Sequence, residues 1–470
     1  MGISNSRSNV PQELKDSPNF LFLSKLFQDR STICDGKRIM NESGFNELFS
    51  NEKKKIIELL FNHTMLMAEA DNKTSKTLEI ASFISAFDKI MKLDSGAKEM
   101  VPYYLNVFNN GKQQISAQDV ERTLTVVYAA ELNTAYEQSS YFQEVARGLV
   151  NKDKETSANK IIELWPRLFN RIHSRIVASL REHDKLYETD QRKKQDCWSI
   201  QTTNAEPIIT PEILWLLSVS IPTVFFGNKR KTVKQDQDSI CEWRDLYNSN
   251  EHGLSHNRFK HHVFSYRGPT VMLIVLENDK RLVLALDVEW RESTKCFGGA
   301  NTRLYEINPG FNILDEESIV FFNEKTRGIP VGLVLGRNPS KPVVSLLDGL
   351  NSAKFGLEEI PVDRIKVWGC AGENAETHQK EQKKWEKRQA EKLQKVFDGF
   401  IIWTPCNYTC TLCILRTFLF VRICRSNCRE PGTKIQIKQS WKWQESRRSM
   451  LTKVDLTVVI KWLLYIVQVL

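Results

Sequence analysis

Apolar residues recur at helical spacing through the first half of the chain, as in residues 78–91 and 120–128. Side chains three or four positions apart share one face of a helix, so each stripe predicts an amphipathic helix that buries one side. Ser116 and Asp119 stand before the second stripe in the positions of a capping box, with Asp in place of Glu or Gln. We therefore predict an all-helical region over residues 11–186.

Two short loops between these predicted helices resemble EF-hand loops. They contain Asp35-Gly36 and Asn109-Asn110-Gly111. A calcium loop needs oxygen ligands at positions 1, 3 and 5, Gly at 6 and Glu at 12. If Gly111 is position 6, Phe108 is position 3 and Ala117 is position 12, and neither can bind calcium there. The sequence predicts an EF-hand-like scaffold without metal, or a plain helical bundle.

The period of the apolar pattern changes from 3.6 to 2 in the second half. Residues 271–276 and 282–288 are apolar runs around a polar turn, which predicts a β-hairpin. Further strands are predicted at residues 303–307, 318–322, 329–335, 342–346 and 364–368. Short strands without helices between them predict an antiparallel two-sheet sandwich. The fold class is therefore α+β, with a helical half followed by a β-sandwich.

The most apolar run of the body, residues 207–226, precedes this sheet. Its length raises the question of a membrane span, but it contains Glu212, Pro211 and Pro222. A residue before proline is disfavoured in a helix, so a buried helix that ends before Pro222 is predicted instead.

The end of the chain differs in composition from the body. Residues 373–396 form a predicted charged helix with Glu/Lys pairs four positions apart. Residues 397–470 hold five cysteines (Cys406, Cys410, Cys413, Cys424 and Cys428) beside apolar and basic residues. Zinc binding and acylation both stay open for these thiols, and we expect this tail to be poorly ordered.

Charge is concentrated in the same part of the sequence. Residues 373–470 contain 18 Lys or Arg and 9 Asp or Glu, which accounts for the whole net charge of +9. The apolar fraction of 41% and the charged fraction of 26% are typical of a folded soluble protein. A body without net charge is not typical of a nucleic-acid-binding domain, so no nucleic-acid partner is expected.

The N-terminus reads Met1-Gly2-Ile3-Ser4-Asn5-Ser6. Gly2 with a hydroxyl residue at Ser6 matches the pattern for N-myristoylation. One such chain gives only marginal membrane binding, so stable anchoring would need a second signal. The sequence thus divides into a lipidation segment (1–10), a helical domain (11–186), a linker (187–206), a β domain (207–372), a charged helix (373–396) and a tail (397–470).

An ordered set of motifs in residues 207–372 resembles the TLDc domain family. The set comprises Trp243, Arg244 and Ser249, then His252, Gly253 and Ser255, then Gly268 and Pro269, then Gly332 and Gly336, and finally Trp368 and Gly369. Val334 and Arg337 stand where family members have glycine. The resemblance implies a two-sheet β-sandwich in which these residues hold the fold.

Three features together are similar to the mTOR-associated TLDc subfamily: the Gly2 signal, the helical first half and the predicted helix before Pro222. This resemblance implies residence in the cytoplasm and at the lysosomal membrane, a role in TOR signalling, and contact with TOR pathway components or vacuolar proton pump subunits. In the family a C-terminal helix clamps a partner, and residues 373–396 are the corresponding candidate.

Three functional hypotheses follow. The first is a non-enzymatic, lipid-anchored regulatory protein without cofactor or metal. The second is a stress-protective protein of the oxidation-resistance type that has no stable membrane site. The third is a hydrolase that uses Ser255 and a nearby histidine such as His252, with Asp287 or Glu289 of the following strand as the acid. The sequence lacks the Gly-x-Ser-x-Gly elbow, so we expect Gly253 to allow a turn and the Ser255 hydroxyl to cap the following helix.

Overall fold

The computed structural model describes residues 10–34, 36–49, 54–68, 77–93, 96–109, 111, 114–132, 134–135, 137–150, 155–182, 199–202, 209–226, 240–324, 327 and 331–402. Gly2 and the five cysteines of the predicted tail lie outside these ranges, as does most of the predicted linker. By contacts the chain divides into two compact units, residues 1–380 and 381–470.

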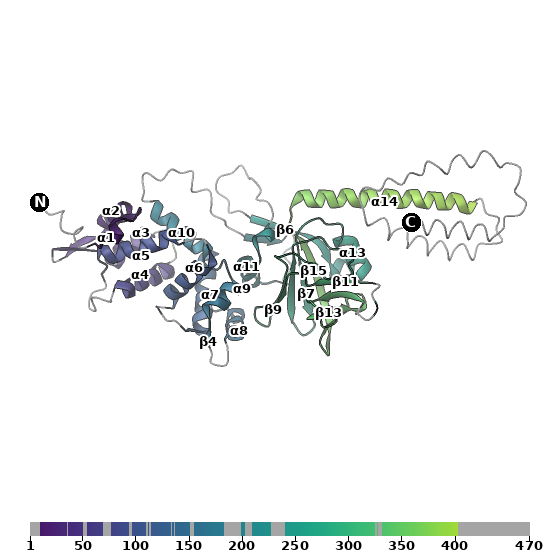
Figure 1. The fold of residues 1–470 in the computed structure, drawn as a ribbon, viewed down its shortest axis with the longest axis horizontal. Helices are drawn as coiled ribbons and strands as arrows, with labels where there is room; N and C mark the ends of the chain where they lie inside the picture. The colour runs from purple at the N-terminus through teal and green to yellow at the C-terminus, as the bar shows by residue number, and fades with distance from the viewer. Residues whose placement is uncertain are drawn as a thin grey trace, which may run out of the picture. The chain divides into compact units, whose positions relative to one another are not determined.

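Residues 10–182 form the predicted helical region, coloured purple to blue in Figure 1. Its helices are α1 (Gln12–Lys15), α2 (Phe20–Arg30), α3 (Glu42–Leu48), α4 (Lys54–Ala68), α5 (Ile80–Lys92), α6 (Ala97–Phe108), α7 (Ala117–Glu131), α8 (Ser140–Leu149), α9 (Ala158–Leu164) and α10 (Asn170–Arg181). The two stripes read from the sequence fall on α5 and α7, whose apolar faces are buried. The prediction of helices here is confirmed.

Short antiparallel bridges join the loops of consecutive helix–loop–helix units. Met40 pairs with Leu78 between the loops that precede α3 and α5. Strand β3 (Ile115–Ser116) pairs with β4 (Glu155–Thr156) between the loops that precede α7 and α9. Strands β1 (Thr32–Cys34) and β2 (Lys37–Ile39) form a hairpin within the first loop. The two bridges between loops therefore each fix two helix starts side by side.

The predicted capping box at the start of α7 is present. The Ser116 hydroxyl accepts a hydrogen bond from the Asp119 N–H (3.2 Å), and the Asp119 carboxylate accepts one from the Ser116 N–H (3.2 Å). Arg122 forms an ion pair with the same carboxylate at 3.1 Å. Asp119 is thus engaged with its own helix and its positive neighbour.

Helix α11 (Pro211–Ser220) confirms the buried helix expected before Pro222. Thr210 caps it through a bond from the Ile213 N–H, and Pro211 sits in the first turn, where its missing N–H costs nothing. The 3₁₀ turn η2 (Thr223–Phe226) follows. In the part of the chain that the structure describes, no helix combines the length and apolar character needed to span a membrane.

A curled antiparallel sheet makes up the second half of the first unit (Figure 1). Its strands are β6 (Ile240–Asn248), β7 (Thr270–Leu276), β8 (Arg281–Leu286), β9 (Arg303–Asn308), β10 (Asn312–Glu316), β11 (Val320–Asn323), β12 (Gly332–Leu335), β13 (Val344–Leu347), β14 (Ser352–Phe355) and β15 (Glu358–Gly369). The short 3₁₀ turn η3 (Asp348–Leu350) lies between β13 and β14. The predicted hairpin corresponds to β7 and β8, whereas β6, β10 and β14 had no counterpart among the predicted strands.

The strands are hydrogen-bonded in the order β10-β9-β8-β7-β15-β14-β13-β12-β11, with β6 also paired to β15. Strand β5 (Ser199–Thr202), inside the predicted linker, pairs with β6 in parallel. The described strands from β5 onward thus belong to one sheet, so a division into two separate sheets is not confirmed.

The long strand β15 holds this path together. Residues 358–361 pair with β14, and residues 362–369 pair with β7 after an irregularity in register between Val362 and Arg364. Residues 366–369 also pair with β6. This single strand therefore joins the strands β7 to β10 to the strands β11 to β14 and to β6.

The core of the helical region continues onto one face of the sheet. Apolar residues of β7, β8 and β9 belong to the same buried cluster as those of α5, α7 and α11. Trp165 packs against Phe311, with ring centroids 6.2 Å apart, and the Tyr141 hydroxyl donates to the Ile307 carbonyl at 2.9 Å. A second cluster fills the other face of the sheet, against α13 (His256–Val263).

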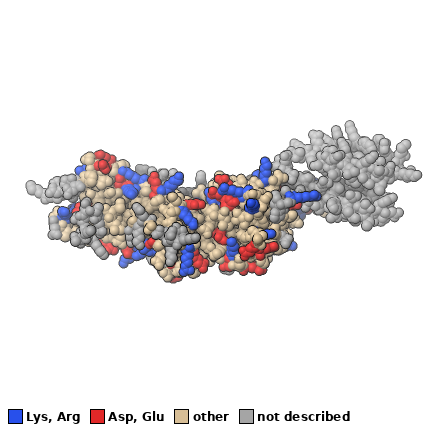
Figure 2. All heavy atoms as spheres, turned by 60° about the horizontal axis from the view of Figure 1, so that its bottom comes forward, with Lys and Arg blue, Asp and Glu red and all other residues tan. Residues whose placement is uncertain are grey.

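The predicted charged helix is confirmed as α14 (Glu373–Ile402), whose first turns belong to the first unit. In the second unit, Gln382 donates to Glu386 at 3.0 Å and Trp385 is 48% exposed. On the face of the molecule drawn in Figure 2, basic and acidic side chains of the described residues are interspersed. This mixture agrees with the lack of net charge in residues 1–372.

Candidate functional site

Two of the motif residues read from the sequence are core tryptophans. Trp243 is fully buried on β6, and its indole N–H donates to the Phe225 carbonyl at 3.0 Å. Its ring lies 6.0 Å from that of Trp368 on the neighbouring strand β15. Both side chains therefore fasten β15 and η2 to β6.

The Ser249 and His252 part of the motif forms the one-turn helix α12 (Ser249–His252). The buried Ser249 hydroxyl accepts a bond from the Ile365 N–H of β15 at 3.0 Å. His252 accepts from the Asn248 N–H through Nδ1 (3.1 Å) and stacks on His262, with ring centroids 3.8 Å apart. These bonds hold the turn against the sheet.

Gly253 ends α12 with φ +73°, a conformation that suits glycine, so its expected role in the turn agrees with the backbone. Its carbonyl accepts from the Tyr247 hydroxyl at 2.7 Å. Ser255 occupies the N-cap position of α13, but its side chain makes no capping hydrogen bond. The predicted helix start is confirmed and the predicted capping role of the Ser255 hydroxyl is wrong. With φ −165° and ψ 131° the backbone is fully extended at this residue, and the hydroxyl does not reach the N–H groups of the first turn.

Asp287, one of the two candidate acids of the hydrolase hypothesis, is engaged elsewhere. The Asp287 carboxylate accepts bonds from the Gly299 N–H (2.8 Å), the Asn301 N–H (3.0 Å) and the Thr302 hydroxyl (2.6 Å). Burial raises the pKa of this carboxyl, but the bonds from Thr302, Asn301 and Gly299 outweigh burial and hold the pKa below its usual value. Asp287 organises the loop before β9, and the geometry does not support a Ser-His-Asp triad.

The remaining motif glycines lie where neighbouring groups come close. Gly332 has φ +125°, and a Cβ built there would lie 2.3 Å from the Leu346 carbonyl oxygen and 2.9 Å from Nε2 of His256. Gly336 has φ +138°. Added Cβ atoms at Gly268 and Gly369 would collide with Ala371 and Tyr266 respectively, each at 2.5 Å. Next to Gly268, the Pro269 carbonyl accepts from the Cys370 N–H at 2.9 Å.

The side chain of His256 lies directly against Gly332. Its Nε2 is buried without a hydrogen-bond partner among the described residues. Burial lowers the pKa of the imidazole, Lys260 lowers it further, and Glu324 opposes them. The ring meets Phe322 edge-on at 5.7 Å. His256 is therefore a half-buried residue whose ring packs between Gly332 and Phe322.

The first turns of α14 dock on the motif residues. Arg244 of β6 forms an ion pair with Glu376, and Gln379 donates to the His262 carbonyl at 2.7 Å. The Tyr266 hydroxyl accepts from the Ala371 N–H at 2.8 Å, and burial raises the pKa of this phenol to about 12. The motif thus fixes the point at which the charged helix leaves the sheet.

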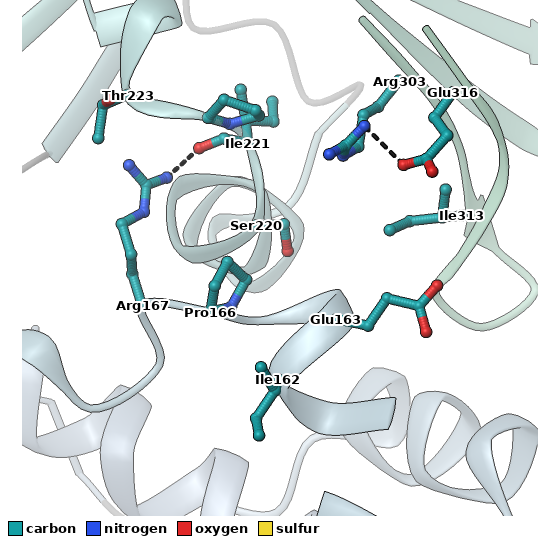
Figure 3. Close-up of a pocket in the computed structure, with 11 residues that line it drawn as sticks. Ile162, Glu163, Pro166, Arg167, Ser220, Ile221, Thr223, Arg303, Ile313 and Glu316 are labelled. Carbon is teal, nitrogen blue, oxygen red and sulfur yellow. Dashed lines mark hydrogen bonds and ion pairs between the residues drawn. The ribbon is translucent and has the colours of Figure 1, made fainter. Parts of the chain in front are cut away.

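A cavity of about 420 Å³ lies where the helical region meets the sheet (Figure 3). We call it the junction pocket. Its walls come from α9 and the segment after it, from the end of α11 and η2, and from β9 and β10. Ile162, Pro166, Ile221, Pro222 and Ile313 supply apolar surface.

Arg167 fastens one wall of this pocket. Its guanidinium donates to the carbonyls of Ser218 (2.6 Å) and Ile221, and its backbone N–H donates to the Val219 carbonyl at 3.3 Å. These carbonyls end α11, where a positive charge is favourable. Burial is the main cause that lowers the pKa of Arg167 to about 10.

Arg303 of β9 and Glu316 of β10 form the opposite wall, with an ion pair at 2.7 Å (Figure 3). The two residues are cross-strand partners, which fixes their separation. Sequence reasoning missed this site completely, since its parts are up to about 150 residues apart and carry no local motif. In the described ranges no group of three or more His, Cys, Asp or Glu is arranged to hold a metal ion.

Comparison with known proteins identifies one domain. A family model described as "TLDc domain" matches residues 203–357, so a TLDc domain is present. The match ends before β15, which the hydrogen bonding makes the central strand of the same sheet. The resemblance read from the motifs is confirmed at this level.

Three curated fungal proteins are similar to part of the chain, each named "Restriction of telomere capping protein 5". The protein of Leptosphaeria maculans is 21% identical over 33% of this chain and 37% of its own length. Those of Pyrenophora tritici-repentis and Candida glabrata are 23% and 22% identical, over 34% of this chain and 39% and 41% of their own lengths. The chain thus spans about two fifths of the length of the curated relatives it matches.

Proposed function

We propose that this TLDc-containing chain is a non-enzymatic regulatory protein that binds other proteins at the cytoplasmic face of the lysosomal membrane. The TLDc domain and the similarity to TLDc proteins support the regulatory, non-catalytic part of this proposal. The engagement of Asp287 in its own loop supports it as well, since it removes one of the two acids that the sequence offered for a triad.

The observation that carries the proposal is the way the motif residues are used. Trp243, Ser249 and Gly332 are buried in packing or backbone bonds and offer no group to a substrate. Arg244 positions the start of α14, a helix of 30 residues. A polar helix gains stability from a partner, so we infer that residues 381–402 take part in binding one.

We further propose that TOR pathway components or subunits of the vacuolar proton pump are those partners, as the subfamily resemblance implies. The test is a pull-down from lysosomal membranes with the full chain and with a chain truncated after Lys380. The truncation keeps Glu376 and Gln379, which pack on the first unit. Equal recovery of pump and TOR pathway subunits by both chains, or recovery by neither, would contradict the proposal.

Membrane residence depends on Gly2 in this proposal. Gly2→Ala should move the protein from the lysosomal membrane fraction to the soluble fraction, while its melting temperature stays unchanged. Asn5→Ala is the matched control, because it changes a neighbouring residue and keeps both Gly2 and Ser6 of the pattern. Unchanged fractionation of the Gly2 variant would favour the alternative of a stress-protective protein without a stable membrane site.

A further inference from the structure

The junction pocket has more hydrogen-bond donors than acceptors near its walls. Nη1 of Arg167, Nη1 of Arg303 and the hydroxyl of Tyr305 are all buried without a hydrogen-bond partner among the described residues. Nη1 of Arg303 lies 2.7 Å from Glu316, so the ion pair is close, but the geometry is not that of a hydrogen bond. Tyr305 lies two residues after Arg303 on β9 and so on the same face of the strand, beside the pocket and not in its lining.

Buried donors without acceptors are costly, at about 1–3 kcal/mol each. Groups of this kind in native proteins are matched by ordered water or by a ligand. The apolar part of the lining, Ile162, Pro166 and Ile313 among others, favours a molecule with an apolar portion over water alone. A volume of about 420 Å³ is within the range of small-molecule sites.

The acidic residues decide which end of a ligand faces the donors. Glu316 is neutralised by Arg303 at 2.7 Å, whereas the nearby Arg337 has its closer partner in Asp315 at 3.0 Å. Glu163 is exposed, so its charge is screened by solvent more strongly than the buried guanidinium of Arg167. The part of the pocket near Arg167 and Arg303 is thus suited to a negatively charged group, and the part near Glu163 is not.

We propose that the junction pocket binds a small soluble molecule that joins an oxyanion, a carboxylate or phosphate, to an apolar group. The oxyanion lies against Arg303 and the apolar group against Ile313 and Ile162. Since the walls belong to the helical region, α11 and the sheet, occupation stabilises the contact between the two halves of the first unit. The inference is independent of the membrane and partner proposals above.

The test is titration of the full-length protein with phenyl phosphate, benzoate and the neutral benzyl alcohol, by calorimetry and thermal shift. Phenyl phosphate and benzoate should bind and raise the melting temperature, and benzyl alcohol should do neither. Arg303→Gln should weaken phenyl phosphate binding at least about tenfold, as expected for the loss of a charge-assisted contact. Arg337→Gln is the matched control, because it removes a neighbouring arginine that pairs with Glu316 but does not line the pocket.

Ile313→Phe gives a second variant, because added volume in the pocket should weaken binding of phenyl phosphate without changing charge. Vesicles of phosphatidylcholine with and without phosphatidic acid should fail to compete with phenyl phosphate. Competition by the anionic vesicles alone would mean that the oxyanion belongs to a lipid headgroup. Absence of binding to the wild-type protein, equal binding of benzyl alcohol, or equal loss in Arg303→Gln and Arg337→Gln would overturn the proposal.

Discussion

The helical region and the sheet are stabilised in different ways, although both contribute to one buried core. Helices of the first half are specified by stripes of apolar residues and by local caps such as Ser116 with Asp119. The sheet depends on contacts between distant residues, such as Trp243 with Trp368 and Gly332 with Leu346. We therefore expect single substitutions to destabilise the helical region less than the sheet, whose strands are held by a few contacts between distant residues.

Among the changes that test this comparison, Trp243→Ala should destabilise the protein most. It removes a fully buried indole and its bond to the Phe225 carbonyl, so the free energy of unfolding should fall by about 4 kcal/mol. Denaturant unfolding followed by circular dichroism measures it. The same measurement on Phe87→Ala, at a fully buried position of α5, gives the loss for the helical region with which that of Trp243→Ala is compared. A loss below 1 kcal/mol for Trp243→Ala would contradict the central role given to the tryptophan pair.

Gly332→Ala should have the next largest effect and lower the free energy of unfolding by about 3 kcal/mol, because it adds backbone strain and a collision with the Leu346 carbonyl. Gly356→Ala is the control: its φ of +59° is also positive, but an added Cβ meets nothing within 4 Å. We expect the control to cost about 1 kcal/mol. Similar melting temperatures for the two variants would show that close approach to β13 is unimportant.

Asp287→Ala should destabilise the sheet by about 2 kcal/mol at neutral pH, since it leaves the N–H groups of Gly299 and Asn301 without their acceptor. A carboxyl whose pKa is depressed by folding stabilises the protein above its unfolded pKa of about 4 and loses that contribution as pH falls through the folded pKa. The difference between wild type and variant should therefore shrink below about pH 4. Urea unfolding from pH 7 to pH 3 measures it, and a constant difference would refute the role of the charge.

Ser116→Ala should have the smallest effect, about 1 kcal/mol, because it removes one side of the capping box of α7. Hydrogen exchange of the first turn of α7 should rise, while the sheet stays protected. The matched change Ser255→Ala, at an N-cap position without a capping bond, should leave stability nearly unchanged. Equal destabilisation by both changes would mean that the cap on α7 has no special value.

The parts of the fold that sequence could predict are those with a local cause. The stripes of α5 and α7, the capping box and the β7–β8 hairpin each lie within about 20 residues and follow from periodicity. Strands β10 and β14 were missed because their short segments are polar or half-buried and show no alternation, and β6 because Glu242, Arg244 and Asp245 interrupt its apolar residues. The helix start at His256 was right, but the conformation of Ser255 depends on the neighbouring turn and was not predictable.

The candidate sites follow the same rule. Residues of the TLDc motif were found because their order along the chain is itself a signal. The junction pocket was not found, since Arg167, Ser220 and Arg303 meet only through the packing of three elements. Unpartnered donors such as the Tyr305 hydroxyl become visible only when the surrounding atoms are placed.

The position of β15 in the chain has a consequence for biosynthesis. Every other strand of the sheet precedes it, yet it joins β7, β6 and β14. A nascent chain that has left the ribosome as far as Phe355 carries three groups of strands, β7 to β10, β11 to β14 and the β5–β6 pair, which only β15 joins. The helical region can mature during translation, but the sheet must wait for Gly369 to emerge, and for that interval its unjoined edges are open to chaperones.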